Sequence, residues 1–273
     1  MPELPEVETT KEGIKVHLEN QVIERVIVRN PQLRLPIASN INDLCAKQTI
    51  HAVSRRGKYI LISLNEGFLL IHLGMSGHLR VVPSITPPGK HDHVDLSLSN
   101  NLALRYCDPR RFGLFHYSVE DPKEHLLSHL GPEPLTEAFN NDYLYEKTRT
   151  KNQPIKSFIM NNEMVVGVGN IYATESLFLA GINPISPAKS INYQQCSQLS
   201  THIKNVLHSA IQAGGTTLKD FYAFDGKPGY FSISLKVYGR KNQPCFDCMT
   251  PIEVHLIAGR TSAFCPSCQP LTP

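Results

Sequence analysis

Long hydrophobic runs and internal repeats are lacking from this 273-residue chain, and its first residues do not have the pattern of a secretory signal. A helix that crosses a bilayer needs about 20 consecutive, mostly apolar residues, and a secretory signal has a basic region followed by an apolar one. The acidic, proline-bearing start "MPELPEVETT" has neither feature. We therefore expect a soluble, cytoplasmic protein. A chain of this length with 41% hydrophobic residues suffices for two domains with their own cores.

A strong net charge is also lacking. The formal net charge is +3 at pH 7 and the pI is near 8.4, so composition alone does not indicate a polyanionic partner. Residues 1–140 contain 15 basic and 16 acidic side chains, whereas residues 141–273 contain 12 and 8. The basic excess therefore lies in the C-terminal part of the chain.

A disulfide framework is not expected, because the cytosol keeps thiols reduced. Three of the seven cysteines are isolated, and we expect them to be small buried hydrophobic residues: Cys45, Cys107 and Cys196. The other four form two C-x-x-C pairs separated by sixteen residues: Cys245, Cys248, Cys265 and Cys268. This spacing is typical of four thiolates around one tetrahedral zinc ion, and the alternative is a redox pair. Four protein ligands leave no open position on the metal, so the zinc is expected to be structural.

The segment between the two pairs, "IEVHLIAGRTSAF", predicts two strands joined by a turn at "AGR". Arg260 then lies at or beside the tip of a hairpin held by the metal. An arginine at a rigid tip can bind a phosphate through two parallel hydrogen bonds, but it can equally be a solvated turn residue.

Residues 155–184 predict two helices joined by a glycine-rich turn. The first is expected over 155–163, and the second starts at Asn170 as N-cap and ends before Gly181. "GVGN" places free backbone N–H groups at a helix start, where an anion such as phosphate is favoured, although a plain interhelical turn is the alternative. Neither the lysine of a Walker loop nor the third glycine of a dinucleotide fingerprint is there. Beside a zinc hairpin in a basic region, this turn indicates nucleic-acid binding.

The N-terminal half predicts a helix over about 7–18 followed by alternating or apolar segments between turn signals. This pattern indicates an antiparallel β-sandwich, so the expected class is α+β. Residues from about 120 to 150 are expected to connect it to the helical part. The expected domains are residues 1–135, 136–235 and 236–273.

Two glycine-flanked loops of the β half carry apolar and basic side chains that a purely structural role does not explain well. "HLGMSGH" contains Met75, and "CDPRRFGLF" contains Arg110, Arg111 and Phe112. Apolar loop tips can insert between stacked bases, with an arginine in the vacated position. The alternative is that Met75 and Phe112 fold into the core and that Arg111 pairs with Asp108.

The first residues have a chemical interpretation. Removal of the initiator methionine leaves Pro2 as the amino terminus, with a secondary amine that can attack a sugar carbon. An α-amino group has a pKa of about 7.7 to 8.0, and the positive end of a following helix lowers it. Glu3 and Glu6 lie within a turn of this nitrogen and can transfer protons. A simple helix entry with acidic residues is the alternative.

Together these motifs resemble the bacterial formamidopyrimidine-DNA glycosylases, which repair oxidised purines. The resemblance covers the whole chain through "MPELPEVE", "RRGKY", "HLGMSG", "KHDHVDL", "DPRRFG", "HLGPEPL", "VVGVGNIYA", "GGTTLKDF", "DGKPGYF", "VYGRK" and the cysteine pairs. It implies a catalytic β-sandwich, a helix–two-turn–helix domain and a zinc finger with one structural zinc ion. The implied partner is double-stranded DNA held between the domains, and the implied state is a monomer. The implied activity is base excision coupled to β,δ-elimination at the abasic site.

The resemblance also implies roles for individual residues. Those expected in catalysis are Pro2, Glu3, Lys58 and Arg260, with Glu6 in support. Those expected to bind DNA are His91, Arg110, Lys156 and Asn170. Those expected to fill the gap left by the extruded base are Met75, Arg110 and Phe112. Those expected in a loop over the lesion are Thr217, Lys219 and Tyr230. From the residues alone, Lys58 would be a charged strand residue that faces water.

Three alternatives stay open. The endonuclease VIII branch shares the N-terminal proline and glutamate but prefers oxidised pyrimidines, and the "MPELPE" start with the Met75 and Phe112 loops favours the purine branch. A non-enzymatic zinc-ribbon DNA-binding protein would leave the N-terminus unexplained. A tautomerase with an N-terminal proline would need neither the zinc site nor this length.

Overall fold

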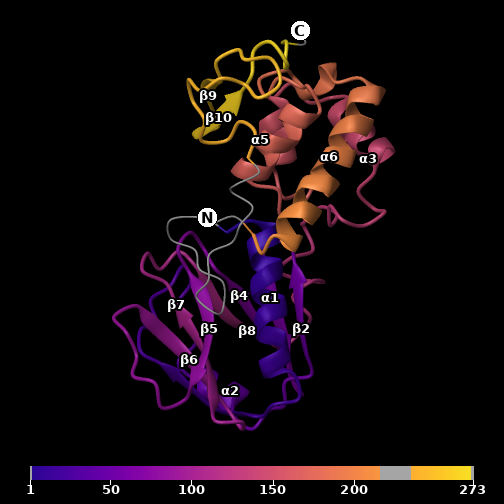
Figure 1. The fold of residues 1–273 in the computed structure, drawn as a ribbon. Coiled ribbons are helices and arrows are strands. Elements are labelled where there is room, and N and C mark those ends of the chain that lie inside the picture. Colours follow the sequence, from indigo (N-terminus) through magenta and orange to yellow (C-terminus); the bar gives the residue numbers. More distant parts are fainter. Residues whose placement is uncertain (1, 216–234, 272–273) are drawn as a thin grey trace. The chain divides into compact units, whose positions relative to one another are not determined.

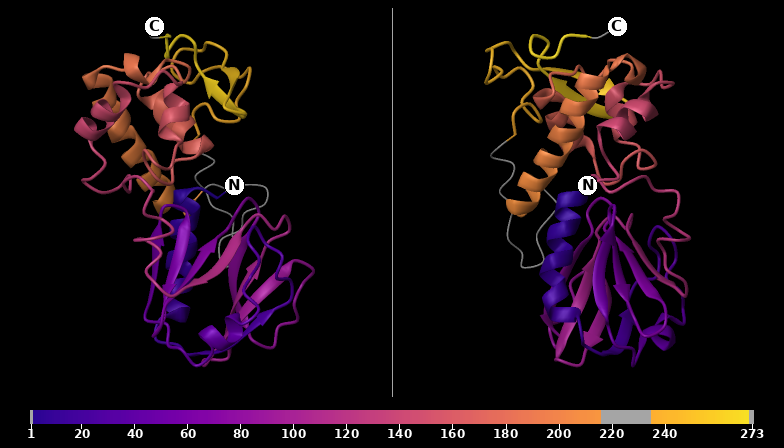
Figure 2. Two further views of the ribbon diagram at one scale, coloured as in Figure 1. Left: turned by 180° about the vertical axis from the view of Figure 1, so that it is seen from behind. Right: turned by 90° about the vertical axis from the view of Figure 1, so that its right-hand side faces the viewer.

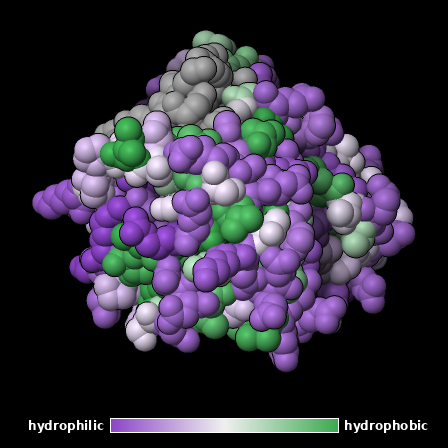
Figure 3. Space-filling model, turned by 90° about the horizontal axis from the view of Figure 1, so that it is seen from below, coloured by the Kyte–Doolittle hydropathy of each residue, from purple (hydrophilic) through white to green (hydrophobic). Residues whose placement is uncertain are grey.

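The computed structural model describes residues 2–215 and 235–271 (Figure 1). They divide into two compact units, one of residues 2–129 with 213–215 and one of residues 130–212 with 235–271. Across these described ranges, no helix combines the length and apolar character needed to span a bilayer. On the face shown in Figure 3, hydrophobic side chains lie in groups separated by hydrophilic ones, as is usual for the surface of a folded domain.

The first unit is built on two four-stranded antiparallel sheets. One has the order β1-β6-β7-β5 and consists of Ile23–Val28, Asp92–Leu98, Leu102–Cys107 and His78–Pro83. The other has the order β2-β3-β4-β8 and consists of Ala52–Arg56, Tyr59–Ser63, Phe68–His72 and Leu114–Ser118. Buried aliphatic side chains from both sheets form one core. The β-sandwich expected from the alternating segments is confirmed.

Helix α1 (Leu4–Leu18) packs against the edge strands β2 and β5, one from each sheet. Figure 2 shows it running along the side of the sandwich. Its apolar face carries Leu4, Val7, Ile14 and Leu18, all buried in the helical spacing of three to four residues. The helix begins three residues before the expected Val7, because Glu3 caps it. A short helix α2 (Ile41–Cys45), not expected from the sequence, packs against β1.

The second unit consists of helices and one hairpin. Its elements are α3 (Asn141–Thr148), α4 (Ile155–Ile159), α5 (Asn170–Leu179), a 3-10 turn (Ala188–Ser190), α6 (Tyr193–Gln212), β9 (Glu253–Ile257) and β10 (Arg260–Phe264). Helix α5 is central, because it packs against α4, α6 and β10. A small core joins Phe178 of α5 to side chains around the hairpin: Val237, Cys245, Ile252, Ala263 and Cys265.

Some boundaries differ from expectation. Helix α4 ends at Ile159 rather than Glu163, since residues 161–169 turn tightly, with Val165 N–H bonded to Asn161 and Gly167 at φ +81°. The connection expected at 120–150 contains helix α3. Helix α5 ends at Leu179, before Gly181, as expected. The isolated cysteines Cys45, Cys107 and Cys196 are buried, as expected.

Candidate active site and nucleic-acid interface

The start of α1 fixes two carboxyl groups beside Pro2. Glu6 accepts the backbone N–H of Glu3 at 2.8 Å, and the Glu3 side chain accepts the backbone N–H of Glu6 in return. This reciprocal capping box satisfies two N–H groups of the first helical turn. Pro2, Glu3 and Glu6 are all buried. The structure therefore brings the three residues expected at the nucleophilic terminus together and holds them in one conformation.

Gly215 lies against Glu6. A Cβ atom at Gly215 would lie 3.3 Å from both Cγ and Oε1 of Glu6, and the glycine has φ +84°, which side-chain-bearing residues rarely adopt. No local pattern indicated this contact, because the two residues lie far apart in the sequence, at positions 6 and 215. The expected lesion-loop residues Thr217, Lys219 and Tyr230 lie outside the described residues.

Lys58 occupies the two-residue turn between β2 and β3, where Gly57 has φ +57°. Its side chain is 8% exposed, so it is not the water-facing strand residue expected from sequence alone. Arg55 connects this turn to α1, because it donates to Glu8 at 2.6 Å and to the Gly57 carbonyl at 2.8 Å. The turn carrying Lys58 is thus attached to the helix that starts at Pro2.

His72, at the end of β4, is uncharged. Burial, with the positive charges of Lys58 and Arg34, lowers the pKa of His72 to about 4. A neutral imidazole offers one acceptor nitrogen, and Nδ1 accepts the backbone N–H of Gly74 at 2.9 Å. His72 therefore fixes the start of the loop that carries Met75.

The two glycine-flanked loops present their apolar tips outward. Met75 is 39% exposed and Phe112 is 49% exposed, so neither folds into the core. The guanidinium of Arg110 lies 5.0 Å from the centre of the Phe112 ring. Arg111 meets Asp108 through its backbone N–H, 3.2 Å from the Asp108 carbonyl. The core alternative for these loops is not what the structure shows.

His91 ends a loop that buried charged side chains hold in place. Arg105 is buried and binds Asp95 through two hydrogen bonds of 2.9 and 2.8 Å. Two of its N–H groups donate to the carbonyls of Thr86 and Pro87. The next carboxylate, Asp92, accepts the backbone N–H of Gly89 at 2.7 Å. His91 is thus presented, half-buried, by a loop with fixed geometry.

In the second unit, Lys156 is 1% exposed and joins three elements. Its ammonium donates to Asn170 Oδ1 at 2.7 Å, to Ser262 Oγ at 2.6 Å and to the Thr261 carbonyl at 3.3 Å. Asn170 Nδ2 also donates to the Thr261 carbonyl, at 3.1 Å. Asn170 is the first residue of α5 rather than its N-cap, which is Gly169. Its side chain contacts the hairpin instead of capping the helix.

Arg260 follows the hairpin turn, as expected. Ala258 and Gly259 have φ +47° and +73°, which is the backbone of a two-residue type I′ turn. A cavity of about 180 Å³ lies beside this turn, with Arg260 and Lys156 in its wall. The other lining residues are Ser157, Met160, Asn161, Ile257 and Ala258. Two cationic side chains make this cavity suited to an anion.

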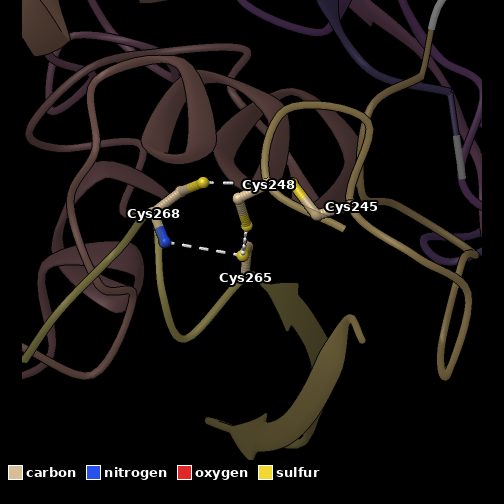
Figure 4. Close-up of side chains that lie close together, drawn as sticks. All are labelled: Cys245, Cys248, Cys265 and Cys268. Atoms are coloured by element: carbon tan, nitrogen blue, oxygen red, sulfur yellow. Dashed lines mark hydrogen bonds between the residues drawn. The ribbon is translucent and has the colours of Figure 1, made fainter. Parts of the chain in front are cut away.

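The four paired cysteines converge from two loops (Figure 4). Their sulfur atoms all lie within 4.8 Å of one another, with 3.4 Å between Cys248 and Cys265 and 3.9 Å between Cys245 and Cys268. Ligands at ~2.3 Å from a tetrahedral zinc ion lie about 3.8 Å apart, so these thiols fit such a site. Hydrogen bonds from Thr250 lower the pKa of the Cys248 thiol to about 6. The clustering expected from the spacing is confirmed.

Glu175 is a functional candidate that no motif indicated. It is buried in α5 and accepts three successive backbone N–H groups, from Lys236 at 2.7 Å, Val237 at 3.0 Å and Tyr238 at 2.8 Å. Its one sequence signal is an acidic residue within the apolar stretch "IYATESLFLAG". Glu175 holds the chain where it enters the cysteine-bearing segment.

Replacement of Glu175 by glutamine should reduce the unfolding free energy by about 1–3 kcal/mol, because the new NH₂ group faces N–H donors and leaves at least one unpaired. Denaturant unfolding measures this loss. Glu146→Gln, at an exposed position of α3, is the matched control and should leave stability unchanged. Equal stability of the two variants would show that the three hydrogen bonds contribute little.

The comparisons with known proteins agree along the chain. Residues 1–115 match the N-terminal domain of formamidopyrimidine-DNA glycosylases, and residues 130–222 match their H2TH domain. A formamidopyrimidine-DNA glycosylase of Legionella pneumophila (strain Philadelphia 1) is 62% identical over 272 residues, covering 99% of both chains. One of Escherichia coli O6:H1 is 52% identical over 269 residues, covering 98% of this chain and 100% of that protein.

Solved structures show the same fold. The Fpg protein of Thermus thermophilus superposes with a TM-score of 0.88 at 37% identity, with 100% coverage of both chains. A Lactococcus lactis Fpg variant in complex with Fapy-dG-containing DNA superposes with a TM-score of 0.92 at 31% identity, covering 98% of this chain and 100% of that one. These matches confirm the α+β architecture with its helix–two-turn–helix part and cysteine-bearing hairpin. The chain belongs to the formamidopyrimidine-DNA glycosylase family.

Proposed function

We propose that this protein is a DNA glycosylase of base-excision repair that removes oxidised purines, such as 8-oxoguanine and formamidopyrimidines, from double-stranded DNA and then cleaves the abasic strand. The observation that carries the proposal is the buried start of α1, where a capping box holds Glu3 and Glu6 beside Pro2. The similarity to formamidopyrimidine-DNA glycosylases supports glycosylase activity, and Lactococcus lactis Fpg has been solved with abasic-site DNA.

In the proposed reaction the amine of Pro2 attacks C1′ of the damaged nucleotide. The lone pair of the nitrogen forms the new N–C1′ bond, and the C1′–base bond breaks with its electrons leaving on the base. The nitrogen loses its proton, and the base takes up one proton, so the step balances. Glu3 transfers a proton to the sugar-ring oxygen, so that the ring opens and the nitrogen becomes an iminium. Glu6 supports this site by orienting Glu3.

The iminium then makes strand cleavage possible. It acidifies the C2′ proton, whose loss expels the 3′ phosphate, and a second elimination expels the 5′ phosphate. Hydrolysis of the remaining iminium regenerates the free amine of Pro2. The product is a one-nucleotide gap flanked by phosphates. The reaction needs no external oxidant or metal-bound water, which is consistent with a purely structural metal site.

Chemistry at C1′ requires the damaged nucleotide to leave the base stack. Extrusion costs a few kcal/mol of stacking and pairing. We propose that Met75, Arg110 and Phe112 occupy the vacated space, since two of them are exposed apolar tips and the third lies beside the Phe112 ring. Five residues would contact the DNA: His91, Lys58, Asn170, Lys156 and Arg260. Lys156 and Arg260 line the cavity beside the hairpin turn.

We propose zinc as the ion held by the four cysteines, where it would fix the hairpin that carries Arg260. The donor set of four thiolates suits zinc, and it leaves no position for substrate. A monomer in the bacterial cytoplasm is the state in which we expect the protein to act on DNA.

Borohydride trapping tests this proposal. The protein is incubated with duplex DNA carrying either 8-oxoguanine or an oxidised pyrimidine, and borohydride reduces the iminium to a stable protein–DNA bond. We expect a strong covalent band with 8-oxoguanine and a weaker one with the pyrimidine. Lactococcus lactis Fpg has been solved with DNA containing an oxidised pyrimidine, so a weak covalent band with the pyrimidine substrate agrees with the proposal. No band with either substrate would exclude the mechanism, and a stronger pyrimidine band would assign the protein to the endonuclease VIII type.

A further inference from the structure

We propose that the buried carboxylate of Asp108 is a positioning residue that holds three DNA-facing loops, residues 73–77, 89–91 and 109–113, in the arrangement that extrudes a base. This inference rests on the proposed function, because it concerns the step before attack by Pro2. Asp108 is fully buried beneath these loops and does not itself reach DNA.

Both oxygen atoms of the Asp108 carboxylate are occupied by hydrogen-bond donors. Oδ1 accepts the Ser76 hydroxyl at 2.9 Å and the backbone N–H of Arg110 at 3.3 Å. Oδ2 accepts the backbone N–H of Gly113 at 2.9 Å and the Tyr106 hydroxyl at 3.2 Å. One side chain therefore connects the Met75 loop with both ends of the loop that carries Arg110 and Phe112.

The backbone of Asp108 connects the third loop. Its N–H donates to the carbonyl of His91 at 3.0 Å. Its own carbonyl lies 2.8 Å from Nε2 of His93, and because a carbonyl can only accept, His93 is the donor. The loop that presents His91 is thus fixed to the same residue as the two apolar tips.

The loop that carries Met75 and the loop that carries Phe112 are in close backbone contact. A Cβ atom on Gly74 would lie 2.5 Å from the Gly113 nitrogen, and one on Gly113 would lie 1.7 Å from the Tyr106 hydroxyl and 2.6 Å from the His72 carbonyl. At these distances there is no room for a side chain, so the backbones of the two loops are packed directly against each other. The relative position of Met75 and Phe112 follows from contacts below them.

The position requires a carboxylate in particular. Four donors point at two oxygens, and an ionised carboxylate is the side chain of this size that only accepts. Tyr106 stays a donor, because burial and the neighbouring Asp108 charge raise the pKa of its hydroxyl. An asparagine would place an NH₂ group against two of these donors, so half of the network would break.

Asp108→Asn tests the inference with two substrates. Excision from an 8-oxoguanine duplex requires extrusion, whereas borohydride trapping on a single strand with a preformed abasic site requires only Pro2 and its neighbours. We expect about 10²-fold slower single-turnover excision from the duplex, because loosened loops misplace the inserted side chains. Trapping on the abasic single strand should match the wild type. A 2-aminopurine next to the lesion should also show a smaller fluorescence rise, which reports unstacking directly.

Two further variants separate positioning from stability. Asn42→Ala removes the side-chain oxygen in α2 that accepts the Val26 N–H of β1 at 2.9 Å, so it destabilises the same unit without touching the loops. Ser76→Ala keeps the carboxylate but removes one of its four donors, together with the Ser76 oxygen that also accepts the Arg110 backbone N–H at 3.2 Å. It should slow duplex excision less than Asp108→Asn while folding normally. It replaces Asp108→Asn if that variant does not fold.

Each outcome is decisive. If the wild type fails to excise from the duplex, the proposed function is wrong. If the wild type excises from the duplex and both Asp108→Asn and Ser76→Ala excise as fast as the wild type, the positioning role is wrong. The positioning role is also wrong if Asp108→Asn slows duplex excision and single-strand trapping by the same factor. It is wrong as well if Asn42→Ala, with the melting temperature of Asp108→Asn, slows duplex excision as much as Asp108→Asn does.

Discussion

A protein that keeps one extra residue in front of Pro2 should lose borohydride trapping and base excision by about 10³-fold or more. An amide nitrogen at Pro2 has no free lone pair, so it cannot bond to C1′ and no iminium forms. Intact-mass analysis of the same preparation establishes whether the terminus is free. Trapping on a single-stranded abasic oligonucleotide measures the loss without any contribution from extrusion.

Pro5→Ala is the matched control for this result. Pro5 is the other proline at the start of the chain and is buried in the first turn of α1, but it lies inside the chain and has no free amine. Its replacement should leave trapping intact with a free Pro2. Full activity in a preparation whose mass shows a retained residue at every amino terminus would remove the basis of the mechanism.

Glu3→Gln with a free terminus should retain attack by Pro2 but slow opening of the sugar ring, since a glutamine side chain cannot donate the proton.

The elements that were predictable from the sequence are those with local signals. The turn at Ala258 and Gly259 followed from a glycine between two apolar segments, and the end of α5 followed from Gly181. The cysteine cluster followed from spacing, because two C-x-x-C pairs have few other ways to converge. Each of these features depends on residues close together in the chain, so the local sequence is enough to indicate it.

The contacts that sequence reasoning missed join distant residues. Glu175 meets Lys236 across 61 positions, and Lys156 meets Ser262 across 106. A lysine between an isoleucine and a serine gives no sign that it will be buried until its three acceptors are known. The burial of Lys156 also bears on its proposed DNA role, since its ammonium must exchange a present acceptor for a phosphate.

Replacement of Cys245 by alanine should have the second large effect, the loss of the metal with the fold around it. Wild-type protein should contain one zinc ion per chain and the variant none, as measured by elemental analysis. Structural zinc sites bind with apparent free energies of about 10–16 kcal/mol, and this binding energy stabilises the fold. Cys245 and Cys265 also belong to the small core with Phe178 and Ile252. We therefore expect an early unfolding transition for the second unit in denaturant.

The comparison with Cys196→Ala distinguishes metal loss from the loss of a buried sulfur. Cys196 lies in the same unit and is as completely buried as Cys245, but it lies outside the four-cysteine cluster. Its replacement should cost about 1 kcal/mol, as for an ordinary core truncation, and zinc content should stay at one. Duplex binding should fall only in Cys245→Ala, because we propose that the metal fixes the hairpin that carries Arg260. Full zinc content and unchanged stability in Cys245→Ala would mean that the cluster does not hold a structural metal.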